Sequence, residues 1–585
     1  MFYFFGFGAR GKNAQDQLLD PVKKILDGCN QALRLVFFLT FVVEVLSVAP
    51  ILYMLNMYDR VLQSRSSVTL VTFTILVLGV YVFWSALEWI RARFLVRISL
   101  RIDWDLAGDV FDAAFRRHIG KRNINAHQVF GDLTILRQFM TGSSLLALMK
   151  APFGILFIVI GAFFHPYLAI FALVAMVLLL ITAYANQRMT TPALKAANDM
   201  QAESVRMANQ VLKQGETALA LGMQPQLKKL WHEKHLAHLQ MQIAASEVGG
   251  VMGSLSNFLA QSLPSLQIAL GVFLAIEGLI TGGMVMAASF LISRSVAPIQ
   301  QVLGSWKAII AAGQAYERLN ILLREDQRDG ERMELPPPLG KLAVSNVTVM
   351  PEGAAKPLLQ NLNFSAEPGT IVAVVGPSAA GKSTLAKLLV GIWKPLRGSV
   401  RLDGAEISDW AHDNLGRYIG YVPQEVTFFE GSVADNIARL NAVNSTRVVQ
   451  AARIAGVHDM ILALPQGYDT RLGDDGYALT GGQKQRLALA RALYGNPLYL
   501  VMDEPNANLD DASERYLKEL IGRLRAEKVT VVFTTHRPSL VNCADYMLVL
   551  NDSRQIAYGK VDEVINAVQK FQADKQVKNP VGIIR

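Results

Sequence analysis

The lengths of its apolar stretches constrain the fold of this chain more than any other sequence feature. A helix needs about 20 mostly apolar residues to cross a membrane. Five stretches in the first half meet or approach that requirement: residues 35–55, 66–87, 151–187, 248–276 and 278–303. The stretch 151–187 is long enough for two helices with a turn at His165 and Pro166, whereas Glu44 and Arg294 interrupt the first and last stretches. The sequence therefore predicts six transmembrane helices.

The composition supports a membrane protein and excludes several other classes. Hydrophobic residues make up 51% of the 585 residues and charged residues only 18%, and the mean hydropathy is +0.27. These values exclude a disordered chain, a coiled coil and a collagen-like protein. A net charge of +9 would also suit a nucleic-acid binding protein, but the apolar content favours a membrane surface, and we expect no nucleic-acid partner. Cys29 and Cys543 form no disulfide framework, so we expect the soluble mass to face a reducing compartment.

Basic residues are unevenly distributed among the segments that connect the predicted spans. They cluster before the first span, at 91–122 between the second and third spans, and at 195–234 between the fourth and fifth. The short loops on the opposite side carry only Arg60 and Arg65. By the positive-inside rule, both termini and both long loops face the cytoplasm. The long loops continue a helical pattern, so we expect helices that project into the cytosol.

The composition changes after residue 325. A charged stretch and three consecutive prolines at 336–338 end the helical pattern. Short β-rich runs at 371–375, 498–502 and 530–535 then alternate with helical patterns, which predicts an α/β domain with a largely parallel sheet. The predicted order is a short cytoplasmic segment at 1–34, an all-α six-span transmembrane domain at 35–325, a linker at 326–340, an α/β domain at 341–570 and a tail at 571–585.

The first β-rich run leads into a glycine-rich loop that matches the pattern G-x-x-x-x-G-K-[ST]. The loop and the residue after it are Gly376, Pro377, Ser378, Ala379, Ala380, Gly381, Lys382, Ser383 and Thr384. In such a loop, backbone N–H groups point at phosphates, and the helix that follows adds a favourable dipole. We expect Lys382 to neutralise the β- and γ-phosphate oxygens and the Ser383 hydroxyl to ligate magnesium. The loop therefore predicts a P-loop domain that binds a nucleoside triphosphate.

The second β-rich run ends in two carboxylates, Asp503 and Glu504. Asp503 suits magnesium coordination through water, and Glu504 is placed to polarise an attacking water molecule. Phosphoryl transfer depends mainly on such positioning and on charge stabilisation. An Asp-Glu pair at the end of a strand is common by itself, but together with the phosphate loop it indicates an ATPase.

Between these motifs, residues 479–486 read Leu-Thr-Gly-Gly-Gln-Lys-Gln-Arg, and this segment resembles the signature of ATP-binding cassette (ABC) transporters. Thr480 stands in place of the usual serine and keeps the hydroxyl. Gln424 resembles the Q-loop glutamine of the family, Asp510 its D-loop aspartate and His536 its switch histidine. The resemblance implies that Glu504, His536 and Lys382 are catalytic and that Gln424 joins Ser383 and Asp503 around magnesium. It implies further contacts to ATP from these residues: Gln424, Thr480, Gly481, Gly482, Gln483 and Asp510.

The resemblance also implies ATP and Mg²⁺ as cofactors and a dimer as the working unit. In the family, each ATP lies between the phosphate loop of one ATPase domain and the signature of another, and this chain contains one of each. Because both Glu504 and His536 are present, a homodimer with two competent sites is favoured. The family usually stacks adenine on an aromatic residue, and residues 347–351 contain none. We therefore expect loose selectivity for the nucleotide base.

The membrane half resembles a narrower family, the ATPases of type I protein secretion in the protease and lipase exporter (PrtD-like) branch. The segment 50–64, Pro-Ile-Leu-Tyr-Met-Leu-Asn-Met-Tyr-Asp-Arg-Val-Leu-Gln-Ser, carries most of this resemblance, which extends over nearly the whole chain. The chain departs from the branch at Lys150 and Phe153, where the branch tends to carry Asp and Trp.

This resemblance implies an ATP-driven exporter in a bacterial inner membrane that moves an unfolded polypeptide with a C-terminal signal, such as a protease, a lipase or an RTX-type protein. The implied partners are a second copy of the chain, a periplasmic membrane-fusion adaptor, a TolC-like outer-membrane channel and the lipid bilayer. An exporter of a small molecule or lipid is the alternative, and a non-pumping channel is disfavoured because Glu504 and His536 are present. A peptidase-containing bacteriocin exporter is not expected, since the segment before the first span is short.

Overall fold

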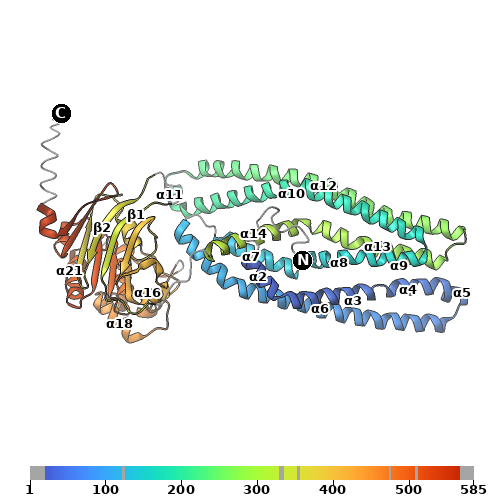
Figure 1. Ribbon diagram of the computed structural model, residues 1–585, viewed down its shortest axis with the longest axis horizontal. Helices are drawn as coiled ribbons and strands as arrows, with labels where there is room; N and C mark the ends of the chain where they lie inside the picture. The colour runs from blue at the N-terminus through green and yellow to red at the C-terminus, as the bar shows by residue number, and fades with distance from the viewer. Residues whose placement is uncertain are drawn as a thin grey trace, which may run out of the picture. The chain divides into compact units, whose positions relative to one another are not determined.

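The computed structural model describes residues 20–121, 126–327, 335–351, 356–473, 476–507 and 511–566. Residues 1–19, residues 328–334 of the predicted linker and the predicted tail at 571–585 lie outside the described ranges. The chain forms two compact units (Figure 1). Apart from the last turn of α6, helices α2 to α14 form the first unit, and the second extends from strand β1 to β12.

Six segments of the described chain are helical, long and apolar enough to cross a membrane, which confirms the predicted number of spans. The helices of the first unit are α2 (Pro21–Gly28), α3 (Asn30–Leu46), α4 (Ala49–Asn56), α5 (Leu62–Ser64), α6 (Ser67–Lys121), α7 (Ala126–Thr141), α8 (Ser143–Lys150), α9 (Gly154–Phe164), α10 (Pro166–Lys213), α11 (Gly215–Ala220), α12 (Gln224–Ile276), α13 (Gly282–Gly304) and α14 (Trp306–Gln327). The spans consist of α3 to α5, α6, α8 with α9, α10, α12 and α13.

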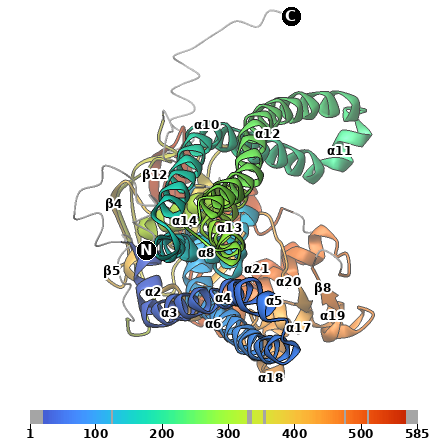
Figure 2. The same ribbon diagram turned by 90° about the vertical axis from the view of Figure 1, so that its right-hand side faces the viewer.

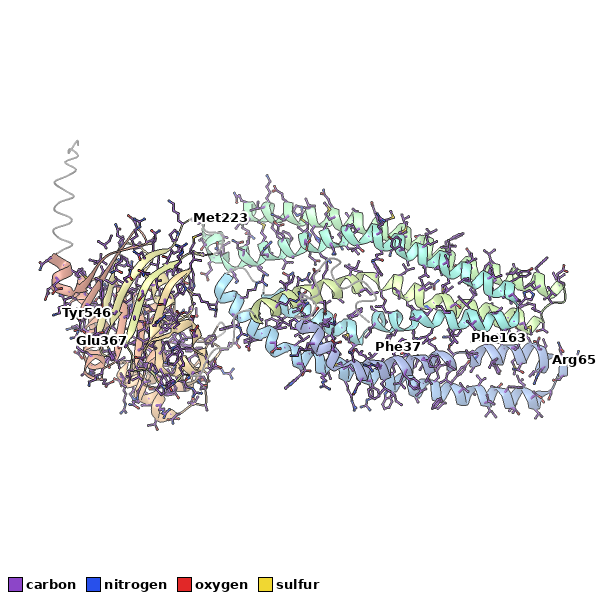
Figure 3. All side chains as sticks on the ribbon, viewed as in Figure 1. Phe37, Arg65, Phe163, Met223, Glu367 and Tyr546 are labelled. Carbon is purple, nitrogen blue, oxygen red and sulfur yellow. The ribbon has the colours of Figure 1, made fainter. Side chains whose placement is uncertain are left out.

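Three of these helices extend far beyond the thickness of a bilayer. Helix α6 has 55 residues, which corresponds to about 80 Å at roughly 1.5 Å per residue, and α10 and α12 are of similar length. Helices α10 and α12 run side by side and are connected through α11 (Figures 1 and 2). Arg65 and Met223 mark opposite ends of this helical unit (Figure 3). The predicted helical extensions are therefore present.

The membrane segments differ in how much protein surrounds them. Only 6% of the most apolar window of α6 is buried, against 56% of that of α13. Large apolar side chains are correspondingly bare, including Val68 at 75% exposure, Val82 at 72% and Phe163 at 84% (Figure 3). Apolar surface of this extent fits contact with lipid or another chain. Helix α13 is the central element of the helical unit.

The third span begins earlier than the sequence predicts. Its prediction started at residue 151, but the structure starts the span at Ser143 and includes Lys150. A 3₁₀ turn (Ala151–Phe153) joins α8 to α9 at this point. The Lys150 ammonium lies 3.3 Å from the Glu44 carboxylate of α3, so opposite charges compensate each other within the spans. The sequence criterion, which looks for apolar stretches without charged residues, cannot detect such a pair.

Near its end, the first span contains a π-helical turn (Met57–Val61) that presents Asp59 to the start of α13. The Asp59 carboxylate accepts hydrogen bonds from the Gly283 N–H at 2.9 Å and from the Thr281 hydroxyl at 2.5 Å. A Cβ atom at Gly283 would lie 2.5 Å from this carboxylate, so a side chain there would displace the carboxylate from the Gly283 N–H. Asp59 thus satisfies an N–H group that the first turn of a helix leaves without an intrahelical partner, and it joins the first span to the sixth.

The second unit is built on a sheet of ten strands in the order β5-β4-β1-β2-β12-β11-β3-β10-β9-β6. The strands are β1 (Leu342–Val349), β2 (Leu359–Ala366), β3 (Ile371–Val375), β4 (Arg397–Leu402), β5 (Ala405–Glu406), β6 (Ile419–Val422), β9 (Tyr499–Met502), β10 (Thr530–Thr535), β11 (Tyr546–Asn551) and β12 (Arg554–Lys560). Strands β11, β3, β10, β9 and β6 are parallel neighbours, as predicted. Strands β1, β2, β4 and β5 pair antiparallel, so the sheet is mixed.

Both faces of the parallel strands are buried. Side chains alternate between the faces of a strand, so Ile371 and Ala373 of β3 join one apolar cluster and Val372 and Val374 join another. The helices of this unit are α15 (Lys382–Leu389), α16 (His412–Tyr418), α17 (Val433–Ile437), α18 (Ser445–Ile454), α19 (His458–Leu462), α20 (Gly481–Leu493), α21 (Asp511–Ala526) and α22 (Pro538–Val541). Burial on both faces explains why the central strands are continuous apolar runs.

We predict that Asp59→Ala lowers the thermal unfolding temperature of the purified protein, because the first turn of α13 loses its acceptor. Removal of a side-chain cap costs about 1 kcal/mol. Asp59→Asn keeps an oxygen for the Gly283 N–H and should retain most of the stability. Arg60→Ala, at the exposed neighbouring position, is the matched control. An unfolding temperature that is the same for Asp59→Ala and Arg60→Ala would contradict the capping role.

Candidate functional site

The phosphate loop follows β3 and depends on two glycines. A Cβ atom at Gly376 would lie 2.3 Å from the Leu550 carbonyl oxygen, and one at Gly381 would lie 2.5 Å from the side chain of Leu359. Gly381 also has a φ of +100°, a left-handed conformation that favours glycine. Helix α15 begins directly after it at Lys382. The strand, loop and helix predicted around these residues are therefore formed.

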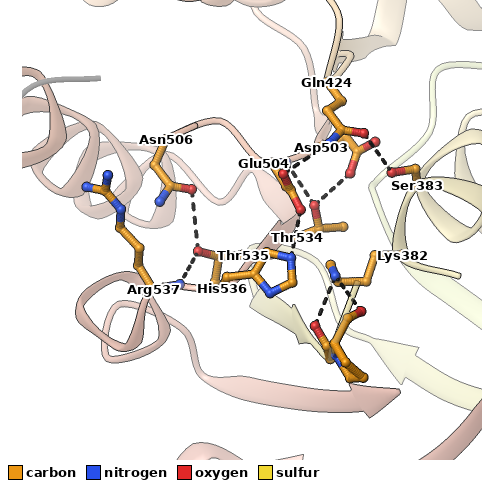
Figure 4. Close-up of polar contacts among 12 residues, drawn as sticks. Lys382, Ser383, Gln424, Asp503, Glu504, Asn506, Thr534, Thr535, His536 and Arg537 are labelled. Carbon is orange, nitrogen blue, oxygen red and sulfur yellow. Dashed lines mark hydrogen bonds and ion pairs between the residues drawn. The ribbon is translucent and has the colours of Figure 1, made fainter. Parts of the chain in front are cut away.

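Lys382 is buried beneath the loop and is held by the loop itself. Its ammonium group donates hydrogen bonds to the carbonyl oxygens of Gly376 at 2.9 Å and Pro377 at 3.0 Å (Figure 4). Burial lowers the pKa of Lys382, and the nearby charges of Glu504 and Asp503 act in the opposite direction. Pro377, Ser378 and Ala379 are exposed at the crest of the loop. The loop thus presents its backbone outward and places one cation beneath it.

The two carboxylates stand at the end of β9, beside the end of β10. The parallel register pairs Met502 with Phe533, so Asp503 and Thr534 come next to each other. The Thr534 hydroxyl donates to Asp503 Oδ1 at 2.7 Å and accepts from the Glu504 N–H at 2.8 Å. Asp503 is 1% exposed. One threonine therefore fixes both acidic residues.

Glu504 is oriented by two further side chains. Its Oε1 lies 2.9 Å from His536 Nε2, and its Oε2 accepts a hydrogen bond from Gln424 Nε2 at 3.1 Å (Figure 4). The backbone of Glu504 has a φ of +48°, the left-handed region that non-glycine residues rarely adopt. Strained conformations of this kind gather at functional sites. The structure brings together Gln424, Glu504 and His536, which are far apart in the sequence.

Three side chains with oxygen atoms that could ligate a metal lie close together: Ser383, Gln424 and Asp503. The Ser383 hydroxyl donates to Gln424 Oε1 at 3.3 Å, and Asp503 lies beside them (Figure 4). Hydroxyl, amide and carboxylate oxygens are the hard ligands that Mg²⁺ prefers. The residues predicted to hold magnesium therefore fit that ion in chemistry and in placement.

The signature segment forms the start of a helix. Helix α20 begins at Gly481, and Thr480 and Gln483 cap it reciprocally: the Gln483 N–H donates to Thr480 Oγ1 at 3.3 Å, and the Thr480 N–H donates to Gln483 Oε1 at 2.9 Å. Thr480 and Gly481 are exposed. Within the described ranges, no hydrogen bond or ion pair connects residues 480–483 with the phosphate loop. The cap prepares a helix N-terminus that can bind an anion.

Asp510, predicted to contribute to the site, lies outside the described residues. Thr534 is the functional residue that the sequence analysis missed. A threonine in a β-rich run is expected for packing alone, and only the register of β9 and β10 shows that its hydroxyl reaches Asp503. Thr535 acts similarly, since its hydroxyl donates to Asn506 Oδ1 at 3.4 Å and accepts from the Arg537 N–H at 3.1 Å. Thr535 thereby holds the backbone of Arg537, the residue after His536.

Two apolar residues lie near the phosphate loop in the chain segment that precedes it. Met350, directly after β1, is 41% exposed, and Leu358 is 36% exposed. The Leu358 N–H donates to the Val349 carbonyl at 2.8 Å, and the Leu358 carbonyl lies 2.8 Å from the position of a Cβ on Gly381. These contacts place Leu358 next to the end of the loop, and Met350 directly follows Val349, the residue to which Leu358 is bonded.

Comparisons with known proteins agree with this arrangement. Residues 33–296 match the family of the ABC transporter transmembrane region and residues 359–507 match the ABC transporter family. The chain is 36% identical over 567 residues to the type I secretion system ATP-binding protein PrsD of Rhizobium meliloti (strain 1021), with 96% of each chain covered. It is 27% identical to the alpha-hemolysin translocation ATP-binding protein HlyB of Escherichia coli, with 91% of this chain and 77% of that protein covered.

Solved structures show the same fold. A bacterial Atm1-family ABC exporter, solved with ATP bound, superposes with a TM-score of 0.78 at 20% identity. The match covers 95% of this chain and 99% of that chain. At this level of identity, the similarity concerns the fold alone.

We predict that Thr534→Val lowers the ATPase kcat by about tenfold or more, because loss of a positioning hydrogen bond to a reacting group costs roughly 1.4 kcal/mol or more of transition-state stabilisation. The variant should bind ATP with little change in Kd, since the phosphate loop is untouched. Thr534→Ser keeps the hydroxyl and is the matched control, with near-normal kcat expected. If Val and Ser variants hydrolyse ATP equally fast, Thr534 does not position the carboxylates.

Proposed function

The chain belongs to the ABC transporters of type I secretion systems, and from this premise we propose that it powers the export of an unfolded polypeptide with a C-terminal signal. It is a multi-pass membrane protein and an ATPase coupled to transport. The observation that carries the proposal is the identity of 36% to a secretion ATPase over nearly the full length of both chains. Relatives named for hemolysin and cyclolysin secretion also cover 91% of the chain.

We assign the hydrolytic step to Glu504. Its carboxylate is fixed by Gln424 and His536 at 3.1 and 2.9 Å, so it can accept a proton from a water molecule that attacks the γ-phosphate. A neutral His536 with its proton on Nε2 would donate to Glu504 and hold its orientation. Lys382 would exchange its two carbonyl partners for phosphate oxygens when ATP binds. Fixed groups of this kind supply the positioning on which phosphoryl transfer depends.

We assign Mg²⁺ to Ser383, Gln424 and Asp503. The ion would neutralise the charge that develops on the phosphates. The hydrogen bond from Thr534 holds Asp503 in place for this role. Because Gln424 contacts both Ser383 and Glu504, a shift of this one side chain would change the metal site and the hydrolytic carboxylate together.

We propose that two copies of the chain form the working unit. The capped signature helix presents Thr480 and Gly481 on the surface, away from any hydrogen bond with the phosphate loop of its own chain within the described ranges. A second copy would place its signature segment against this phosphate loop, and its own phosphate loop would meet the signature segment of the first copy. ATP would favour this closed dimer, and hydrolysis would reopen it. We further propose an inner-membrane location, cytoplasmic termini, a periplasmic adaptor and a TolC-like outer-membrane channel.

The alternative functions lack a specific supporting observation. The similarity to an Atm1-family exporter shows the fold and does not favour a small-molecule or lipid cargo. A non-pumping channel would not need the contact between Glu504 and His536, which is present at 2.9 Å. Secretion of a polypeptide is therefore the function that we propose.

The decisive experiment measures the ATPase activity of the protein in lipid nanodiscs with peptides added. We expect a C-terminal peptide from a secreted protein encoded beside this chain to change the ATPase rate, whereas the same residues in scrambled order leave it unchanged. A rate that responds only to lipids or drugs would contradict the proposal.

Two variants control that experiment. Glu504→Gln should bind ATP and lower the rate by about 100-fold or more, as expected for loss of a general base. Lys382→Ala should instead weaken ATP binding by about tenfold or more, since hydrogen bonds to charged groups contribute roughly 1.5–3 kcal/mol. Near-normal hydrolysis by Glu504→Gln would remove Glu504 from the role of base.

We also predict weak discrimination between ATP and GTP, because Met350 and Leu358 offer the base an apolar surface without a ring. Met350→Trp should tighten ATP binding by about fivefold or more, since stacking of a base on an aromatic ring is worth roughly 1–3 kcal/mol. Leu462→Trp, on the exposed surface of α19, is the control. If the Met350→Trp variant and the wild type bind ATP with equal Kd values, the base does not lie next to Met350.

A further inference from the structure

Two opposite charges face each other inside the membrane-spanning part of the helical unit. Glu44 lies in α3 and Lys150 at the end of α8, and their side chains are 7% and 22% exposed. The Lys150 Nζ atom lies 3.3 Å from Glu44 Oε1. Lys150 is about 21 Å along the helix from Phe164, the last residue of its span, at roughly 1.5 Å per residue. With Phe164 at one surface of a hydrocarbon core about 30 Å thick, the pair lies inside that core.

The pair is placed at a break in the third span. The 3₁₀ turn Ala151–Phe153 follows Lys150 and interrupts the helix. Phe153, in this turn, contacts Phe37 and Phe41 of α3, with ring centroids 5.2 and 5.7 Å apart. The charged contact and the aromatic contacts thus connect the same two spans at the same level.

The sixth span meets this break from another side. Gly154, the first residue after the turn, approaches α13 so closely that a Cβ atom would lie 2.9 Å from the Ser295 carbonyl oxygen. Further along, Ile51, Phe157 and Leu291 form one buried cluster of the first, third and sixth spans. Asp59 joins the first span to the start of α13 as well. The first, third and sixth spans therefore form one packed set.

Separation of the two charges would be very unfavourable in this environment. A single ionised side chain in hydrocarbon has no water to solvate it, and removal of one partner from a buried ion pair leaves the other charge uncompensated. Packed apolar side chains already restrict how helices shift past each other, and an ion pair adds a defined partner and distance. The Glu44–Lys150 pair thus selects one register of α3 against α8.

We propose that Glu44 and Lys150 are positioning residues that keep the first span fixed to the break of the third span throughout the ATPase cycle. The first and third spans then keep this contact when ATP closes the dimer, and other contacts of the helical unit change instead. Without the pair, ATP hydrolysis continues but moves less cargo. The expected change in the amount of exported polypeptide rests on the proposed function. The expected constant distance between α3 and α9 is independent of that function.

The distance test uses the full chain in nanodiscs, with Cys29 and Cys543 replaced by Ser and spin labels at Val45 and Ile155. Both positions are exposed, on α3 and α9. We expect the same narrow distance distribution without nucleotide and with ATP in the Glu504→Gln background, and a broader distribution after Lys150→Met. A shift of more than about 5 Å on ATP binding, the size of a one-turn helix displacement, would overturn the proposal.

The coupling test compares variants by cargo exported per ATP hydrolysed. Glu44→Gln and Lys150→Met should each lower this ratio by about tenfold, within the usual range of coupling between sites, with little change in the ATPase rate without cargo. The exchanged pair Glu44→Lys with Lys150→Glu should restore the ratio. Ser47→Ala, which removes only a hydroxyl bonded to the Glu44 carbonyl oxygen, is the control and should behave as wild type.

A purely structural role predicts a different pattern. The apolar double variant Glu44→Leu with Lys150→Met contains no unpaired charge, so we expect it to recover the unfolding temperature of the wild type but not the export ratio. Recovery of both quantities would overturn the proposal, as would an exchanged pair that restores neither. If the wild type exports no polypeptide while the spin-label distances behave as expected, the proposed cargo is wrong and the positioning role stands.

Discussion

A hydrocarbon layer offers no hydrogen-bond partner to a backbone or a charge, and the helical unit follows from that constraint. Six helices satisfy their backbone groups internally, and several charged side chains of the spans find partners on other spans. Asp59 accepts hydrogen bonds at the start of α13, and Glu44 pairs with Lys150. Arg294 lies over the ring of Trp84, 5.3 Å from its centroid. Each interruption of the apolar stretches is therefore a contact between helices.

The ATPase unit depends on a different constraint, the register of parallel strands. Strands β3, β9 and β10 carry the phosphate loop, the two carboxylates and the switch histidine at their carboxyl ends, and a parallel sheet brings these ends to one edge. The register is fixed by buried side chains on both faces, such as Val501 and Phe533. A short side chain, Thr534, can then hold Asp503 and Glu504 together. The geometry of the candidate site is a consequence of how the sheet packs.

Sequence patterns predicted most of the elements, because apolar runs and glycine-rich loops are local features. They predicted the six spans, the helical extensions, β3 and the cluster of Gln424, Glu504 and His536 that the structure brings together. They placed the start of the third span too late, because Lys150 ends an apolar run although Glu44 compensates its charge. They gave no indication of the antiparallel part of the sheet, since β1, β2 and β4 mix polar with apolar residues and form no continuous apolar run. Contacts between distant segments decided each of these points.

The two departures from the secretion branch, at Lys150 and Phe153, show the same division. By itself, the sequence determined that the chain crosses a membrane, that it carries an ATPase domain and which residues are candidates for contact with ATP, because these properties follow from composition and from motifs of fixed spacing. Only the tertiary structure decided that Lys150 and Phe153 both contact α3, through Glu44 at 3.3 Å and through Phe37 at 5.2 Å between ring centroids. An ion pair and an aromatic contact depend on distance in space. The partners are more than a hundred residues apart in the sequence, so the sequence patterns do not show that they are close.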